Sequence, residues 1–318
     1  MTPYQSTQPL LGIAFKVTST LAFAGMTTLI KLVSDRYPVG ELVFFRSFFA
    51  LIPVFCWVCW RDRRLSAAVT VFHTTRVTSH VIRSAAGVTG MFLGFAALAR
   101  LPIADATAIG YASPLLTVIC AVIILQEKVH VFRWTAVGIG LAGVLVVISG
   151  YFLPEAGEPD RSVFGVVLAL AAALTGALAS TYTRMLTRYE AAATIVIYFS
   201  SLCALLGALT LPFGWQWPTP LDAVALVLAG ICGGIGQVFL TQCYRFGDAS
   251  TIAPFDYTSI IWILIASLLV FGTWPSATVL GGTAIVIASG LFVIWRERQL
   301  GIERSRSNRA QTPTTPLN

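Results

Sequence analysis

The chain carries one segment twice: residues 105–118 read DATAIGYASPLLTV, and residues 248–261 read DASTIAPFDYTSII. Both copies begin with Asp-Ala followed by Thr or Ser, and both carry a Pro and a Tyr shortly afterwards. The stretches 12–33 and 165–186 also correspond, with Lys31 falling on Arg184. Shared composition of apolar helices could produce such a likeness, but the common start and the matching register favour two copies of one unit.

The composition indicates a membrane protein. Of 318 residues, 56% are hydrophobic and only 11% are charged, with a mean hydropathy of +0.79. Soluble domains carry roughly 25% charged residues, which form their polar surface. A soluble core large enough to hide this much apolar surface is excluded for a chain of this length. Lipid can solvate an apolar exterior, so the bilayer removes the difficulty.

The apolar runs predict an all-α integral membrane protein with ten spans. A spanning helix needs about 20 mostly apolar residues. The predicted spans are 10–33, 39–60, 80–99, 103–125, 131–150, 162–186, 191–211, 221–243, 248–271 and 275–295. Residues 10–150 would then form a first five-helix repeat and residues 162–295 a second. Because five is odd, the second repeat enters the membrane from the opposite side, and such inverted repeats are typical of secondary transporters.

Basic residues predict the orientation. Most Arg and Lys fall in the loops after the even-numbered spans and in the C-terminal tail, a set that includes Arg76 and Arg83. The positive-inside rule therefore places both termini in the cytoplasm. The net charge of +7 is explained in the same way, without a nucleic-acid partner. The polar, turn-rich tail over 299–318 is predicted to be disordered.

Several motifs resemble the EamA branch of the drug/metabolite transporter superfamily over residues 10–297. The matching marks are Arg46 within FFRSFFAL, Ala97-Leu98, the stretch from SPLLTV to ILQEKV with Gln126-Glu127, and APFDYTSI. Gly272-Thr273 departs from the Gly-Glu with which the second half often ends. Within the branch, FFRSFFALIP, IGYASPLL, LPFGW and STIAPFDYTSIIW look most like bacterial riboflavin transporters. The resemblance implies a multi-pass protein of the bacterial inner membrane that takes up riboflavin. The same stretches also resemble exporters of amino acids and importers of other metabolites.

Asp256 is the first candidate for the substrate or coupling site. A carboxylate deep within an apolar span is costly and by default functional. Pro254 interrupts the helix nearby, and Tyr257 follows. At the corresponding depth the first repeat offers a similar set, consisting of Tyr111, Ser113 and Pro114. Transporters build sites from interrupted helices of this kind. The alternative is a structural carboxylate satisfied by Tyr or Gln neighbours.

Further polar residues lie within predicted spans. Lys16 either reaches the cytoplasmic headgroups or lines a cavity. Arg46 needs a partner or a wet cavity, as a clamp between helices or as a substrate contact. Glu41 is expected near the outer end of the same span. Gln237 lies in a Gly-rich run that permits close approach of a helix or ligand.

The sequence gives no sign of catalysis, of a cofactor or of a metal site. His73, His80 and His130 are assigned to cytoplasmic loops and lack metal-ligand spacing. No P-loop motif is present, and Cys56 and Cys59 are read as packing residues. The chain is therefore predicted to be a transporter rather than an enzyme, with a small metabolite and membrane lipid as partners. A membrane scaffold without transport is the competing class, and a homodimer is one of the oligomeric states left open.

Overall fold

The computed structural model describes residues 9–62, 74, 76–126, 131–152, 162–186, 189–190, 192–246 and 253–311. Over these residues the secondary structure is helical, without strands. The α-helices are α1 (Pro9–Val33), α2 (Val39–Asp62), α4 (Val77–Leu98), α5 (Ile103–Gly110), α6 (Ala112–Leu125), α7 (Val131–Phe152), α8 (Val163–Leu186), α9 (Ala192–Ala208), α10 (Pro220–Phe246), α12 (Thr258–Phe271) and α13 (Ala277–Gln311). Two short 3-10 helices are η1 (Leu211–Phe213) and η2 (Ala253–Tyr257).

In the described part of the chain, eight helical segments are long and apolar enough to cross a membrane. These are α1, α2, α4, α5 with α6, α7, α8, α10 and α13. Two shorter apolar helices, Ala193–Ala208 and Phe255–Phe271, fall where the seventh and ninth spans were predicted. Every predicted span thus coincides with a helix, but among the described residues only eight reach full length. The described part of the ninth begins with η2 and continues as α12.

The outer surface of the helices is apolar. Leu269 is 77% exposed, and Leu145 and Ile123 are each 65% exposed. Such side chains would aggregate in water, whereas lipid tails solvate them. The exposed apolar surface therefore agrees with an embedded bundle.

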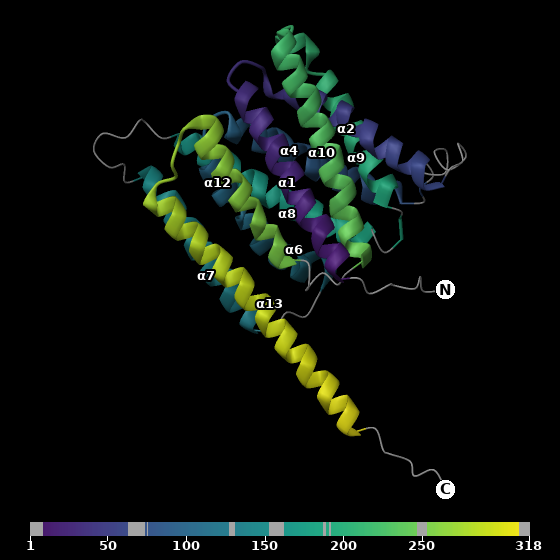
Figure 1. Cartoon of the computed structure of the whole chain (residues 1–318), viewed down its shortest axis with the longest axis vertical. Helices are drawn as coiled ribbons and strands as arrows, with labels where there is room; N and C mark the ends of the chain where they lie inside the picture. Colours follow the sequence, from purple (N-terminus) through teal and green to yellow (C-terminus); the bar gives the residue numbers. More distant parts are fainter. Residues whose placement is uncertain are drawn as a thin grey trace.

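The helices pack in a small set of lengthwise pairs (Figure 1). α1 lies along α10, and α4 lies along α8. α2 contacts both α9 and α10, while α6 contacts α8 and α12 contacts α1. α7 and α13 run side by side at one edge, and the end of α13 projects beyond the bundle (Figure 1). At this seam Gly143 and Gly282 allow close approach, because a Cβ on Gly143 would meet the Gly282 carbonyl oxygen at 2.8 Å.

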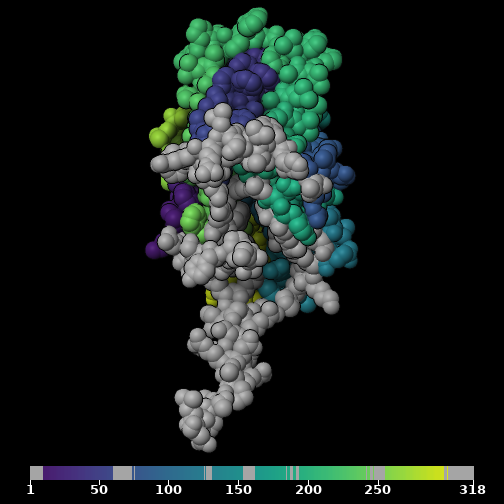
Figure 2. All heavy atoms as spheres, turned by 90° about the vertical axis from the view of Figure 1, so that its right-hand side faces the viewer, coloured from purple at the N-terminus to yellow at the C-terminus, as the bar shows by residue number. Residues whose placement is uncertain are grey.

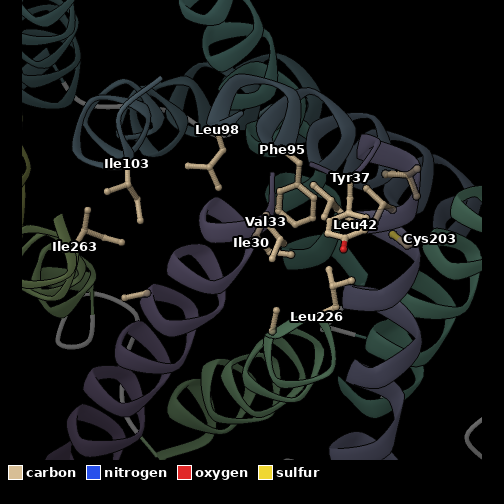
Figure 3. Close-up of a cluster of buried hydrophobic side chains, with 14 of the residues drawn as sticks. Ile30, Val33, Tyr37, Leu42, Phe95, Leu98, Ile103, Cys203, Leu226 and Ile263 are labelled. Carbon is tan, nitrogen blue, oxygen red and sulfur yellow. The ribbon is translucent and has the colours of Figure 1, made fainter. Parts of the chain in front are cut away.

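The main hydrophobic core lies where the helices of both halves meet (Figure 3). Ile30 and Val33 of α1, Leu42 of α2, Cys203 of α9 and Leu226 of α10 are all at most 1% exposed. α4, α5 and α12 contribute further side chains to this core. The two halves therefore share one core and do not form separate domains.

The α9–α10 connection covers one end of α2, the green segment over the indigo helix in Figure 2. The Trp215 ring lies 5.2 Å from the Phe44 ring, and the Gln216 amide donates to Glu41 at 3.1 Å. Glu41 lies near this end of α2, but it is 0% exposed because the connection encloses it. The carboxylate is thus held by protein and not by an aqueous interface.

The C-terminal tail differs from its prediction at its beginning. α13 continues as a helix to Gln311, although disorder was predicted from 299. Residues 302–311 contain neither Gly nor Pro, so no helix-breaking residue stops the helix after the membrane segment. Residues 312–318 lie outside the described residues.

Candidate functional site

An ion pair joins the two halves of the chain at the centre of the candidate site. Lys16 Nζ on α1 lies 2.5 Å from Asp256 Oδ1 on η2. The lysine side chain is 2% exposed, whereas the aspartate side chain is 46% exposed. Lys16 therefore does not reach the headgroups, and of its two predicted roles the structure favours the interior one. The pair thus combines a cation enclosed by protein with a carboxylate that is nearly half exposed.

Hydroxyl groups fix the backbone around this pair. Thr20 Oγ1 of α1 lies 2.8 Å from Thr258 Oγ1 of α12, and Ser19 donates to the Gly236 carbonyl of α10 at 2.9 Å. Ser259 donates to the Asp256 carbonyl at 2.7 Å, within the transition from η2 to α12. The Ser259 bond satisfies a carbonyl at the helix interruption, where an unpaired carbonyl would be costly inside a membrane. α1, α10 and α12 are thereby tied together beside the ion pair.

Two tyrosines complete the site from both repeats. Tyr111 lies between α5 and α6, and its hydroxyl is 2.6 Å from Ser259 Oγ. Its ring centroid is 5.7 Å from that of Tyr257, at an interplanar angle of 53°. The Tyr257 hydroxyl lies directly over Gly290 of α13, where a Cβ would collide with it. The regions around Tyr111 and Tyr257, one from each predicted repeat, therefore lie in contact.

The two predicted helix breaks lie beside these tyrosines. α5 ends at Gly110, four residues before Pro114, which has no N–H to donate to the Gly110 carbonyl. Pro254 lies in η2, and its backbone is 3-10 helical. Ser113 faces α8, because a Cβ added at Gly176 would meet its hydroxyl at 3.3 Å. Gln237 follows Gly236 on α10, at the level of Ser19.

Arg46 is separate from this ion pair. It is 3% exposed on α2, donates from Nε to Met26 Sδ at 3.4 Å and lies 6.0 Å from the centre of the Phe199 ring. A Cβ on Gly233 would meet its Nε at 3.1 Å. Its Nη1 is buried without a hydrogen-bond partner among the described residues.

A second buried arginine was missed by the sequence analysis. Arg83 is 8% exposed on α4, with Nε donating to Thr183 at 3.0 Å and the guanidinium 4.0 Å from the centre of the Phe199 ring. Its placement with the loop residues was wrong, as was that of His80, which is 2% exposed on α4. The helix begins at Val77, earlier than the apolar run, because these polar side chains face neighbouring helices and not water.

Other features fall outside the site. Two apolar hollows of about 350 Å³ and about 160 Å³ are lined by α1 with α12 and by α5, α12 and α13, and neither lining includes Lys16 or Asp256. Within the described residues, no three His, Cys, Asp or Glu side chains gather as metal ligands would. All six cysteines are free, and Cys56 and Cys59 are exposed on α2. His73 and His130 lie outside the described residues.

The sequence model of the EamA-like transporter family matches residues 10–149 and 163–295. The chain belongs to the EamA-like transporter family. A relative in Rickettsia conorii, an S-adenosylmethionine uptake transporter, is 24% identical over 91% of this chain and 94% of its own length. A riboflavin transporter of Rhizobium johnstonii is 26% identical over 92% and 94%. A solved structure with 20% identity covers 91% of this chain and 98% of its own with a TM-score of 0.67, which shows a shared fold.

Family membership settles the class of activity. EamA-type relatives carry the names of transporters and not of enzymes. Together with the candidate spans, this makes the chain a transporter and a multi-pass protein of the bacterial inner membrane. The relatives are named for different substrates, so the transporter class is common to them and the substrate is not.

Proposed function

We propose that this EamA-type chain is a secondary transporter with ten spans in two inverted repeats and both termini in the cytoplasm. It imports a small metabolite by alternating access, with Lys16 and Asp256 in the substrate or coupling site. The observation that carries this proposal is the ion pair itself, which joins α1 of one repeat to the interrupted helix of the other.

The repeat proposal is supported by the two ranges that the family model matches, which coincide with the predicted halves. It is also supported by helix packing. When each span is exchanged with the span five places later, the α1–α10 pair maps onto α8–α4. The α1–α12 pair maps likewise onto α8–α6, and α2–α10 onto α9–α4. The α2–α9 and α7–α13 pairs map onto themselves, as contacts on a two-fold axis must.

The ion pair suits a transporter because a ligand can take the place of Lys16 at the Asp256 carboxylate. Substrate or a proton can approach the half-exposed carboxylate of Asp256, while Lys16 stays enclosed. A ligand that replaces the lysine at Asp256 loosens the link between α1 and η2. Differential binding of this kind is what shifts a two-state equilibrium. Alternating access then consists of one repeat rocking against the other around the site.

Two substrates are proposed, riboflavin and S-adenosylmethionine, because relatives with these names match over nearly the whole chain. The tilted Tyr111 and Tyr257 rings would suit a flat ring system in either metabolite. The Asp256 carboxylate favours the second, because it can attract a cationic sulfonium or ammonium group.

Transport by the purified chain in liposomes tests the proposal. Radiolabelled riboflavin, S-adenosylmethionine and a set of amino acids are supplied on either side, with and without a pH gradient. Saturable uptake of one metabolite is expected, and Asp256→Asn is expected to reduce it about tenfold or more, since one charged contact contributes that much. Asp35→Asn, at an exposed carboxylate, is the matched control. Export of amino acids without uptake of any metabolite would favour an exporter. If the chain moves no metabolite, a membrane scaffold is favoured.

A further inference from the structure

Basic side chains of α4 and its N-terminal neighbour form a regular row against aromatic rings of the α8–α9 region. The pairs are Arg76 on Tyr189 at 3.8 Å, His80 on Tyr198 at 4.9 Å and Arg83 on Phe199 at 4.0 Å. Spacings of four and three residues place all three basic groups on one helix face. The row leads from the exposed Arg76, just before the N-terminus of α4, to the enclosed Arg83.

Arg46 of α2 meets this row at its inner end. Its guanidinium lies 6.0 Å from the centre of the same Phe199 ring, so one ring contacts both arginines. Cys203, one turn further along α9, is 0% exposed. Figure 3 shows Cys203 at the edge of the main core. Both cations therefore lie beside the Phe199 ring of α9, one from α2 and one from α4.

The inner end of the row has unused hydrogen-bond donors. Nη1 of Arg46 and Nη1 of Arg83 are both buried without a hydrogen-bond partner among the described residues. Among the described residues, neither arginine forms an ion pair with a carboxylate. The Glu190 carboxylate lies beside the outer part of the row, 4.0 Å from His80 Nε2, and accepts a hydrogen bond from Thr74.

Two enclosed guanidinium groups without a carboxylate are unfavourable unless an anion joins them. The aromatic ring offsets only part of this cost. Guanidinium presents its N–H groups as a fork that fits the paired oxygens of a carboxylate or phosphate. An oxyanion that accepts from both Nη1 groups would satisfy both donors and both charges.

We infer that Arg46 and Arg83 form an oxyanion-binding subsite, reached along α4 past Arg76 and His80, that holds the carboxylate or phosphate group of the transported metabolite. The inference rests on the proposed transport function and narrows its substrate. Riboflavin carries neither group, whereas S-adenosylmethionine carries a carboxylate.

The test measures binding without transport. The full chain, purified in a maltoside detergent, is titrated calorimetrically with sodium phosphate and separately with sodium acetate at constant ionic strength. Saturable binding of at least one of the two anions is expected. The anion that binds more tightly shows whether the subsite prefers a phosphate or a carboxylate. Arg83→Gln is expected to weaken this binding about tenfold or more, because charged hydrogen bonds are lost. Arg100→Gln is the control, since Arg100 also lies over a phenylalanine ring, that of Phe164, but is exposed.

Arg83→Lys retains the charge without the fork, so intermediate binding is expected, and it replaces Arg83→Gln if that variant fails to fold. Lack of saturable binding of either anion by the unaltered chain would overturn the subsite. Equal binding by the Arg83 and Arg100 variants would do the same. Anion binding without any transport in liposomes would instead contradict the proposed function, so the two failures are distinguishable.

Discussion

At the residue scale, the Lys16–Asp256 pair is asymmetric, and its asymmetry predicts unequal effects of substitution. Asp256→Asn removes the countercharge of a lysine that is 2% exposed, which is expected to cost about 3 kcal/mol or more. Lys16→Met leaves a carboxylate that is 46% exposed, so its cost is expected to be smaller, about 1 kcal/mol. Denaturant unfolding of each purified variant in detergent measures both values.

The double variant Lys16→Met with Asp256→Asn serves as the control for this pair. It removes both charges, so it is expected to be more stable than Asp256→Asn alone. A double variant whose loss equals the sum of the two single losses would show that the pair contributes no coupling energy. Lys16→Met costing more than Asp256→Asn would show that enclosure does not set the asymmetry.

The residues of the site could be predicted only in part from the sequence. Asp256 was recognisable because a carboxylate within an apolar run is rare. Its pairing with Lys16 was not, because the two residues are distant in sequence and the pair is made by folding. Arg83 was missed for another reason: it lies at the start of an apolar run, where a polar residue usually marks a loop. Only the three-dimensional packing shows that this start is buried.

At the element scale, the position of η2 depends on α13. The Tyr257 hydroxyl occupies the space above Gly290, so Gly290→Ala is expected to displace η2 and with it Asp256. Overpacking of this kind costs about 1–3 kcal/mol. Transport should fall together with the unfolding midpoint. Gly281→Ala, on the same helix with no atom near its Cβ position, should leave both unchanged. Equal behaviour of the two alanine variants would refute the contact.

The C-terminal ends of α6 and α12 share an uncommon backbone conformation. Gln126 has φ 53° and Gly272 has φ 62°, so both end residues are left-handed. This conformation costs a non-glycine residue roughly 1–2 kcal/mol. Gln126→Gly is therefore expected to stabilise the chain by about 1 kcal/mol. The gain is reduced by the loss of the hydrogen bond that the Gln126 side chain donates to the Ile123 carbonyl. Gly272→Ala should destabilise it by a similar amount. Thermal unfolding reports both signs, and the same sign for both would contradict the assignment.

The elements themselves were largely predictable, because apolar runs and breakers are local signals. Each predicted span overlaps a helix, and Pro114 marked the α5–α6 interruption. The lengths were less predictable. α9 and α12 fall short of full length, and α13 extends past its apolar stretch to Gln311. Helix ends depend on caps and neighbouring helices as well as on hydropathy.

At the scale of the whole molecule, the pseudo-two-fold relation between the repeats holds for the packing of the helices but not for the charges of the site. Asp256 corresponds to Ser113 when the two repeats are aligned on their shared Asp-Ala start. The ion pair therefore has no charged equivalent in the first repeat, although the surrounding helix pairs do have equivalents. A symmetric scaffold can thus rock between two states while an asymmetric site sets which ligand it binds.

The inverted arrangement makes a sharp prediction about which side of the membrane each connection faces. Asp35 follows α1 and Tyr189 follows α8, so they occupy equivalent places in the two repeats. Inversion places Asp35 outside and Tyr189 in the cytoplasm. In right-side-out vesicles an impermeant maleimide should therefore label Asp35→Cys, and it should label Tyr189→Cys only after permeabilisation. Both positions are exposed, so burial does not limit the reaction. The parent chain carries Cys56→Ser and Cys59→Ser, because those two cysteines are also exposed. Labelling of both positions from the same side would mean parallel repeats, and alternating access by inverted halves would then have to be abandoned.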